Sequence, residues 1–343
     1  PEPRMTPGRS AVALVVALLG SAVAADPAEL RKDMKADGLD VTVFAAPPDV
    51  SYPTCLAAAP DGTLFVGVDL NGSLGAKADK GRVVRCVDTN RDGVADQFNT
   101  FCEVESPRGL WWDGDNALYV LHPPFITKYT DTNGDGTAEI GYDVVRGLGF
   151  DLKFRGADHT TNGFRYAIDG FFYVAVGDYG AVKATGTDGR TIQLRGGGVV
   201  RVRPDGTGLE VVSTGQRNIY DVAVSPTLDL FTRDNTNDGG GWNVRLSHVV
   251  PTAEYGYPRL FKHFPDEIVP ALADYGGGSP CGAIFLDEPA LPKGLFFCEW
   301  GRSEVTSHPL TANGATWKVG AGTLMKLSRP TDIDADGCGQ LFV

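Results

Sequence analysis

The sequence predicts an all-β fold, a six-bladed β-propeller, and two features carry this prediction. The 343-residue chain holds 44 glycines and 22 prolines but few long helix-like runs, which is typical of short strands joined by tight turns. A turn followed by an apolar strand, of the type Asp-Gly-x-Leu-Phe-Val, also recurs six times. Such a repeat is the sequence signature of a propeller or a solenoid.

The six repeats follow one another at nearly constant intervals. They cover residues 59–69, 112–122, 167–178, 225–235, 291–301 and 334–343. Their aligned strand residues, 54, 54, 58, 65 and 46 positions apart, are Leu64, Leu118, Phe172, Leu230, Leu295 and Leu341. Each interval is about the length of four short strands with their loops, which is one propeller blade. A β-sandwich with coincidental turns is the alternative, but it gives no reason for a near-constant interval.

The last repeat ends inside its strand, at Val343. We therefore expect a propeller that is C-terminally truncated in its last blade. Propellers close by bringing first and last strands into one sheet, so the early apolar stretch 41–45 is expected in that closure.

The first 24 residues have the pattern of a signal peptide. Arg9 precedes the apolar stretch 11–19, and Ala22-Val23-Ala24 fits a cleavage site. An uncleaved membrane anchor is the alternative, but the apolar stretch is shorter than the ~20 residues that span a bilayer. We predict a signal peptide at 1–24, a propeller over 25–343, and an exported protein, periplasmic or secreted, with no transmembrane span in the mature chain.

Charge and cysteine spacing exclude several function classes. The formal net charge of −12 and the pI near 4.9 argue against nucleic-acid binding, which needs clustered Lys and Arg. Six cysteines are enough for disulfides in an exported protein, although their wide spacing fixes no pairing. Since no Cys-x-x-Cys occurs, this chain has neither a c-type haem site nor a structural zinc site of that type.

Two loops have the spacing of calcium ligands. Oxygen donors stand at loop positions 1, 3, 5 and 9, with glycine at position 6, as in the first three-quarters of an EF-hand loop. The donors are Asp88, Asn90, Asp92 and Asp96 in one loop, and Asp131, Asn133, Asp135 and Glu139 in the other. We expect the loops to cap equivalent hairpins and to bind Ca²⁺ in a structural role. Turns without an ion are the alternative, since these residues also suit hairpin loops.

Two polar pairs precede strands of successive repeats. Asp158-His159 precedes the strand of the third repeat, and Arg217-Asn218 precedes that of the fourth. An imidazole can take a proton from a substrate hydroxyl, while Asp158 or another carboxylate fixes its tautomer. A guanidinium and an amide can hold a carboxylate or quinone oxygen. A solvated loop histidine and a rim arginine are the alternatives.

At these positions the sequence resembles a known family. The segments 157–180, 215–226, 234–242 and 254–261, in that order, resemble the soluble glucose/sorbosone dehydrogenases, which are six-bladed propellers that use pyrroloquinoline quinone (PQQ). The resemblance covers residues 38–343 and is closest to the planctomycete-type sorbosone-dehydrogenase-like proteins and the related membrane-bound dehydrogenase domain.

The resemblance implies roles for individual residues. His159 is the general base, Asp158 its neighbour, and Arg217 and Asn218 contact the cofactor. Arg329 stands where the family has a cofactor-binding arginine, and Arg302 or Trp300 replaces its lysine. A second family arginine is Thr331 here. Calcium orients the quinone in the family, through the loop that here contains Asp234, Asn235 and Asp238.

The resemblance implies an exported quinoprotein oxidoreductase that oxidises a sugar or related alcohol or aldehyde by hydride transfer to PQQ, with Ca²⁺ as a second cofactor. A cytochrome c is the electron acceptor it suggests, because many planctomycete-type relatives carry one C-terminally. A non-catalytic propeller that binds carbohydrate or protein is the alternative. A metal-dependent lactonase would need Glu, Asn and Asp ligands converging on the axis.

Overall fold

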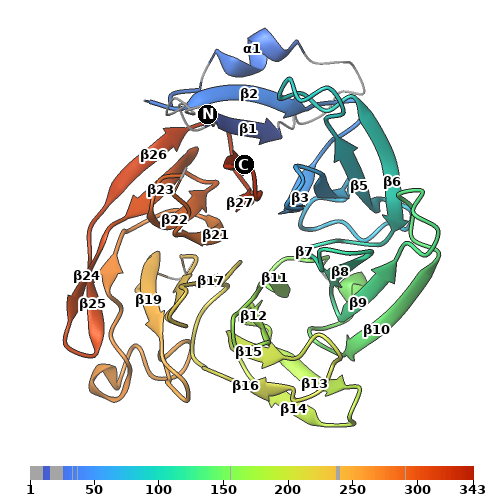
Figure 1. The fold of residues 1–343 in the computed structure, drawn as a ribbon. Helices are drawn as coiled ribbons and strands as arrows, with labels where there is room; N and C mark the ends of the chain where they lie inside the picture. Colours follow the sequence, from blue (N-terminus) through green and yellow to red (C-terminus); the bar gives the residue numbers. More distant parts are fainter. Residues whose placement is uncertain are drawn as a thin grey trace, which may run out of the picture.

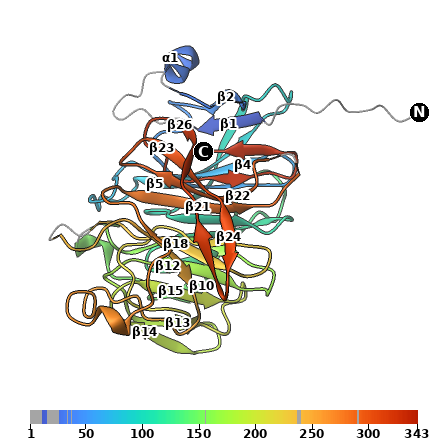
Figure 2. The same cartoon turned by 90° about the vertical axis from the view of Figure 1, so that its left-hand side faces the viewer.

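The fold is a ring of β-sheets around a central axis (Figure 1). The computed structural model describes residues 11–15, 26–32, 34–36, 38–154, 156–236, 240–289 and 291–343. Helical structure in these residues is confined to α1 (Pro27–Arg31) and the 3-10 turns η1 (Leu152–Phe154) and η2 (Pro265–Glu267). Helix α1 lies outside the ring in both views (Figures 1 and 2). The all-β prediction and the propeller arrangement are therefore confirmed.

Five regular blades, each of four antiparallel strands, follow one another along the chain. From the innermost strand outward, blade 1 is β3 (Pro53–Ala58), β4 (Leu64–Asp69), β5 (Gly81–Val87) and β6 (Gln97–Glu103), and blade 2 is β7 (Gly109–Trp112), β8 (Ala117–His122), β9 (Phe125–Thr130) and β10 (Ile140–Arg146). Blade 3 is β11 (Thr161–Tyr166), β12 (Phe172–Val176), β15 (Gly198–Val202) and β16 (Glu210–Val211). Blade 4 is β17 (Ala223–Val224), β18 (Leu230–Arg233), β19 (Arg245–Val249) and β20 (Ala273–Asp274), and blade 5 is β21 (Pro280–Leu286), β22 (Gly294–Glu299), β23 (Glu304–His308) and β26 (Gly322–Lys326).

The remaining large sheet, the closing sheet, differs from a blade. It has the order β27 (Asp334–Ala335), β28 (Gln340–Phe342), β1 (Ala11–Val15) and β2 (Asp40–Ala45). Only β27 and β28 follow blade 5, so strands from the other end of the chain complete the sheet, and β1 runs parallel to both of its neighbours. The prediction of six like blades is therefore corrected to five regular blades and one mixed sheet. The expected closure by the stretch 41–45 is confirmed, since it lies in β2.

The repeat motif marks the second strand of each sheet. All six aligned residues lie in the second strand from the axis, and each is at most 3% exposed. Neighbouring blades cover both faces of these strands, which is why they read as continuous apolar runs rather than alternating ones. In β12 every residue is buried. Phe164 and Phe172, for example, pack with Tyr119 of blade 2 in one cluster.

Two hairpins extend the regular plan. The hairpin β13 (Ala181–Gly186) and β14 (Thr191–Leu194) leaves blade 3 between β12 and β15 and pairs with β10 of blade 2, so blade 2 becomes part of a six-stranded sheet. The hairpin β24 (Leu310–Asn313) and β25 (Thr316–Val319) is inserted between β23 and β26.

Antiparallel order gives the ring two different ends. Connections between blades, such as 104–108, 156–160, 214–222 and 328–333, lie at one end together with the turns between second and third strands. We call this the linker end. The remaining turns, including 88–96 and 131–139, lie at the other, the hairpin end.

Two sequence expectations concern the chain outside the blades. Most of the predicted signal peptide lies outside the described residues, while its apolar residues Ala11–Val15 form β1. Within the described residues, no helix has the length and apolar character to cross a membrane. All six cysteines are free, so the considered disulfides are not formed. Burial raises the pKa of the Cys281 thiol to about 12, so this thiol is un-ionised at neutral pH.

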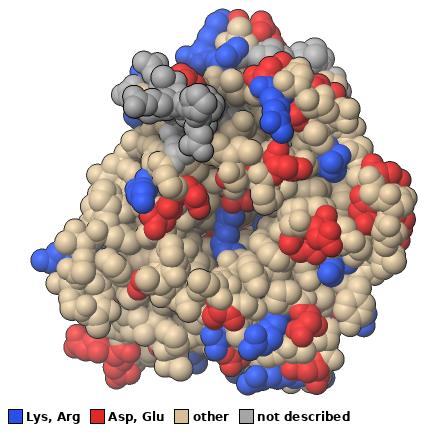
Figure 3. Space-filling model, in the orientation of Figure 1, with Lys and Arg blue, Asp and Glu red and all other residues tan. Residues whose placement is uncertain are grey.

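One buried ion cluster joins blades across the axis. The guanidinium of Arg165, on the innermost strand of blade 3, lies 2.9 Å from Asp221, 3.2 Å from Asp332 and 3.4 Å from Asp334. Asp221 also accepts a hydrogen bond from the backbone N–H of Ala283 in blade 5. Basic and acidic atoms meet in the hollow at the centre of the ring (Figure 3). The cluster therefore connects blade 3, blade 5 and the closing sheet through charged groups.

The axial aspartates also bond to the next sheet around the ring. Asp332 accepts from the backbone N–H of Leu56, and Asp334 accepts from that of Ala58, both in β3. Burial raises the pKa of Asp332, although the charge of Arg165 opposes this shift. These carboxylates close the ring between the closing sheet and blade 1, and Arg165 supplies their counter-charge.

We expect Arg165→Met to lower the free energy of unfolding by about 3–5 kcal/mol, because it leaves buried carboxylates without a counter-charge. Urea denaturation measures this loss. The matched control is Arg146→Met, which removes an exposed guanidinium paired with Asp143 and should change stability by less than about 0.5 kcal/mol. Equal small losses in both variants would contradict a stabilising role of the cluster.

Candidate functional site

His159 lies at the linker end, two residues before β11. Its backbone has φ of 60°, in the left-handed region that non-glycine residues rarely adopt. Its Nδ1 is 2.5 Å from Oδ1 of Asp178, and its Nε2 is 3.7 Å from Oδ2 of Asp158. The ring of Tyr179 stacks on the imidazole with a centroid distance of 5.2 Å. The hydrogen-bonded partner of His159 is thus Asp178, while Asp158 faces the other ring nitrogen.

Sequence reasoning did not assign Asp178 a role. Its signal was the Gly177-Asp178 dipeptide directly after the strand of the third repeat, which marks where that chain segment leaves the sheet. The hairpin β13–β14 begins three residues later and pairs Gly186 with Val145 of blade 2. Docking of this hairpin holds the Asp178 segment against blade 2, so two blades together fix the histidine and its carboxylate.

Arg217 and Asn218 lie in the connection that leads into blade 4, beside the His159 segment. The side-chain amide of Asn162 donates to the carbonyl of Thr160, at 3.0 Å, and to that of Ile219, at 3.3 Å. One nitrogen therefore joins the residue after His159 to the residue after Asn218. The backbone N–H of Gly163 also donates to the backbone carbonyl of Tyr220, at 2.6 Å. The structure thus brings the two predicted segments together.

Polar atoms without a partner gather in these two segments. Among the described residues, Thr160 Oγ1, Arg217 Nε and Asn218 Oδ1 are buried and make no hydrogen bond. A buried polar group without a partner costs about 1–3 kcal/mol. Arg217 is 4% exposed, so its charge is also largely removed from water. A ligand bound here would have to supply an acceptor for Arg217 Nε and a donor for Asn218 Oδ1.

Asp234 belongs to the same group. It is buried, and its Oδ2 accepts from the backbone N–H of Arg217 at 2.8 Å and from Nε1 of Trp242 at 3.2 Å. Its Oδ1 has no partner among the described residues. Burial raises the pKa of Asp234 to about 7. Of the other predicted calcium residues here, Asn235 Oδ1 accepts from the N–H of Thr236, and Asp238 lies outside the described residues.

Arg302 and Arg329 lie in a second group, at the linker end of blade 5. Arg302 is 3.5 Å from Glu299 and 3.4 Å from Glu304, and Arg329 stacks over the exposed Trp300 at 4.6 Å. The charge of Arg302 is thus shared between two carboxylates of its own blade.

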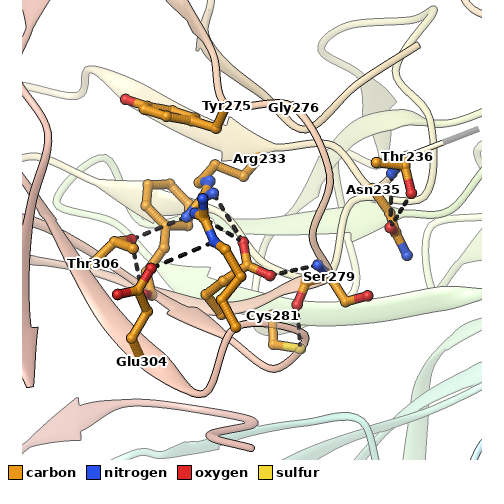
Figure 4. Close-up of polar contacts among 12 residues, drawn as sticks. Arg233, Asn235, Thr236, Tyr275, Gly276, Ser279, Cys281, Glu304 and Thr306 are labelled. Atoms are coloured by element: carbon orange, nitrogen blue, oxygen red, sulfur yellow. Dashed lines mark hydrogen bonds and ion pairs between the residues drawn. The ribbon is translucent and has the colours of Figure 1, made fainter. Parts of the chain in front are cut away.

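Glu299 pairs with a second arginine, Arg233, which Figure 4 shows beside Thr306. Arg233 and Glu299 are fully buried, 2.9 Å apart, and Arg233 also donates to the hydroxyl of Thr306 at 3.0 Å. The other oxygen of Glu299 accepts from the backbone N–H of Ser279. Sequence reasoning missed this pair, because an arginine at the end of an apolar strand gives no sign that it is buried. It fixes the segment from which Asp234 and Asn235 follow.

The two calcium-like loops lie at the hairpin end, away from His159. They join β5 to β6 and β9 to β10, so they occupy equivalent places in blades 1 and 2, as predicted. In the second loop, carboxylate oxygens of Asp131, Asp135 and Glu139 lie within 4.8 Å of one another. In the first, Asp88 accepts backbone N–H groups of the loop, including that of Gly93 at 2.8 Å.

Each of these loops contacts the preceding sheet. The carbonyl of Phe44 in β2 accepts from the N–H of Ala95, and that of Phe101 in β6 accepts from the N–H of Ala138. The loops therefore join neighbouring sheets at the rim, which is a structural position.

The sequence matches one family model. The profile of a family described as "Domain of unknown function (DUF7133)" matches residues 27–268. Among curated proteins, none matches the sequence.

Solved structures show the same fold. A Thermus thermophilus oxidoreductase described as a glucose dehydrogenase has a TM-score of 0.65 and 18% identity, covering 90% of this chain and 92% of the other. The PQQ-bound aldose sugar dehydrogenase of Streptomyces coelicolor has a TM-score of 0.60 and 18% identity, with coverages of 82% and 84%. The holo PQQ domain of a Coprinopsis cinerea pyranose dehydrogenase has a TM-score of 0.64 and 13% identity, with 96% of each chain covered. At these identities, the likeness establishes the fold.

The buried Asp234 carboxyl should make stability depend on pH. Its pKa is about 7 in the folded protein and ordinarily near 3.8, so the folded state binds the proton more tightly. This contribution is fully present below pH 3.8 and is lost as pH rises through 7. Over that range, the free energy of unfolding should fall by about 4 kcal/mol.

Denaturation of the wild type and of Asp234→Asn at several pH values tests this expectation. The variant cannot titrate at this position and should lack that part of the pH slope. Asp266→Asn, at an exposed position, is the control and should keep the slope. A slope that is identical in all three proteins would show that Asp234 does not titrate as its burial predicts.

Proposed function

Since this chain belongs to the family described as domain of unknown function DUF7133, its activity has to be inferred from its own site, and we propose a quinone-dependent oxidoreductase that oxidises a sugar or a related alcohol or aldehyde. The observation that carries the proposal is the His159–Asp178 pair beside the buried Arg217 and Asn218, whose polar atoms lack partners. The PQQ-containing relatives of the same fold support it.

His159 is the proposed general base. In this proposal, Nδ1–H of His159 donates a hydrogen bond to Asp178. The lone pair of Nε2 is then available to take a proton from a substrate hydroxyl. Asp178 is positioned to stabilise the imidazolium that forms, and the carboxylate of Asp158, 3.7 Å from Nε2, adds to this stabilisation. The stacked Tyr179 limits rotation of the ring.

Arg217, Asn218 and Thr160 are the residues that we propose to hold a flat, carboxylated quinone. Their unpartnered atoms offer two N–H or O–H donors and one amide oxygen in a largely buried place. When bound, PQQ supplies the acceptor for the hydride that leaves the substrate carbon. Arg217 would hold an anionic oxygen of the cofactor by a charge-assisted hydrogen bond. We extend the proposal to Arg302 and Arg329, which present guanidinium groups at the same end of the ring.

Calcium is proposed in two roles. In the first, Asp234 and Asn235, beside Arg217, bind an ion that orients the cofactor. In the second, the loops 88–96 and 131–139 bind structural ions at the hairpin end. Export to the periplasm or medium and a cytochrome c as electron acceptor remain proposals that rest on the sequence.

The aspartates at the axis do not favour the alternative of a metal-dependent lactonase. Asp221, Asp332 and Asp334 converge there, as a metal-dependent lactonase would need. However, the guanidinium of Arg165 lies among them and supplies the positive charge. Their oxygens also accept backbone N–H groups of neighbouring sheets. These carboxylates are therefore assigned to structure.

Three variants test the base. With protein reconstituted with PQQ and Ca²⁺ and an artificial dye as acceptor, His159→Ala should lower kcat for an aldose by roughly 10²–10⁴-fold. Asp178→Asn should lower kcat more than Asp158→Asn, because only Asp178 fixes the tautomer. Quinone binding should be retained in all three.

Full activity of His159→Ala would remove the residue from catalysis. Wild-type protein that binds sugar but shows no dye reduction would favour the alternative, a non-catalytic carbohydrate-binding propeller. Equal effects of Asp178→Asn and Asp158→Asn would contradict the assignment of the orienting carboxylate.

The loop 131–139 provides a separate test of calcium. Ca²⁺ at about 100 times its Kd should stabilise the protein by about 2.7 kcal/mol, because it binds only the folded loop. Thermal melting with Ca²⁺ and with a chelator measures this shift. Asp135→Asn should reduce it, whereas Asp115→Asn, at an exposed turn, should not. A melting temperature that is unchanged by Ca²⁺ would leave the loop as a hydrogen-bonded turn.

A further inference from the structure

A cavity of about 550 Å³ runs along blade 5 from the turn before β22 to Lys326 near the linker end, and no residue of the His159 group lines it. It is formed by the turn before β22, the end of β23 and the strand β26, and Lys35 bounds it at the edge of β26. None of the predicted site residues lines it.

The lining combines an apolar surface with positive charge. Pro292, Phe296 and Leu324 contribute apolar atoms, and Lys35, Lys293 and Lys326 contribute ammonium groups; among the described residues that line the cavity, none is acidic. A cluster of three cations is unexpected in a chain with a net charge of −12. Lysine also covers apolar surface with its methylene groups while its ammonium stays at the opening.

Two of the lysines lie directly opposite each other. Lys35 and Lys326 form an isolated antiparallel bridge, with backbone N–H to C=O distances of 3.0 and 2.8 Å in the two directions. Like charges at directly opposite positions of an antiparallel pair are destabilising. Lys293 is 2.7 Å from Asp287, but both side chains are more than half exposed, so water weakens this pair. Glu304 of β23 lies opposite Lys326 on the other side and offsets part of this repulsion, and an anion beside Lys35 and Lys326 would offset more of it.

We propose that this cavity binds an organic anion with an apolar body. Its carboxylate or phosphate group lies beside Lys35 and Lys326, and its apolar body lies on Leu324 and Phe296 toward Pro292. Apolar contact contributes about 25 cal/mol for each Å² removed from water, so both parts of such a ligand contribute to binding. The proposal is independent of the redox chemistry.

Titration calorimetry with the full chain, below micelle-forming concentrations, tests this site. Decanoate and decyl phosphate carry the two head groups, and the tighter of them identifies the preferred anion. Decanol and inorganic phosphate each lack one part and should bind more weakly. Lys326→Gln should weaken binding of the preferred amphiphile about fivefold, and added salt should weaken it further.

Lys318→Gln, at an exposed position on β25 outside the cavity, is the matched control and should leave binding unchanged. The proposal is overturned if neither amphiphile binds, if decanol binds as tightly as decanoate, or if the two lysine variants weaken binding equally.

Discussion

The ring depends on charge at its axis. Arg165 reaches from blade 3 to aspartates that themselves accept backbone N–H groups of blade 5 and blade 1. Because Asp221 and Asp332 are buried and Arg165 is only 16% exposed, each of these two carboxylates is acceptable only while its partners remain in place. Tyr220 adds a contact across the axis by donating to the carbonyl of Thr54 at 2.7 Å. These contacts hold separate sheets at fixed positions around the axis. The connections between the sheets are fixed with them.

The candidate site is built on those connections. His159 and Arg217 come from successive linkers, which the amide of Asn162 joins. Asp178 comes from a turn of the same blade that a hairpin fixes to blade 2. Each side chain therefore stands on a loop, but each loop is held by strands of two blades. Such support is what a base and its orienting carboxylate need in order to keep one geometry.

Much of the fold was predictable from the sequence, because the apolar second strand of each sheet is buried on both faces and Leu64 or Leu118 marks it locally. The meeting of the His159 and Arg217 segments was also predictable, since residues before inner strands lie at one end of a propeller. Asp178, Arg233 and Glu299 were not, because their roles depend on contacts between segments far apart in the chain. The mixed closing sheet was missed for the same reason: parallel pairing of β1 leaves no local signal.

The most direct measurement of the central claim is equilibrium binding of PQQ to the purified chain in the presence of Ca²⁺, for the wild type and Arg217→Met. A site formed by the His159 and Arg217 segments should bind one quinone per chain. Loss of the guanidinium should weaken this binding by about tenfold or more. Absence of quinone binding in the wild type, or equal binding by the two proteins, would contradict the account.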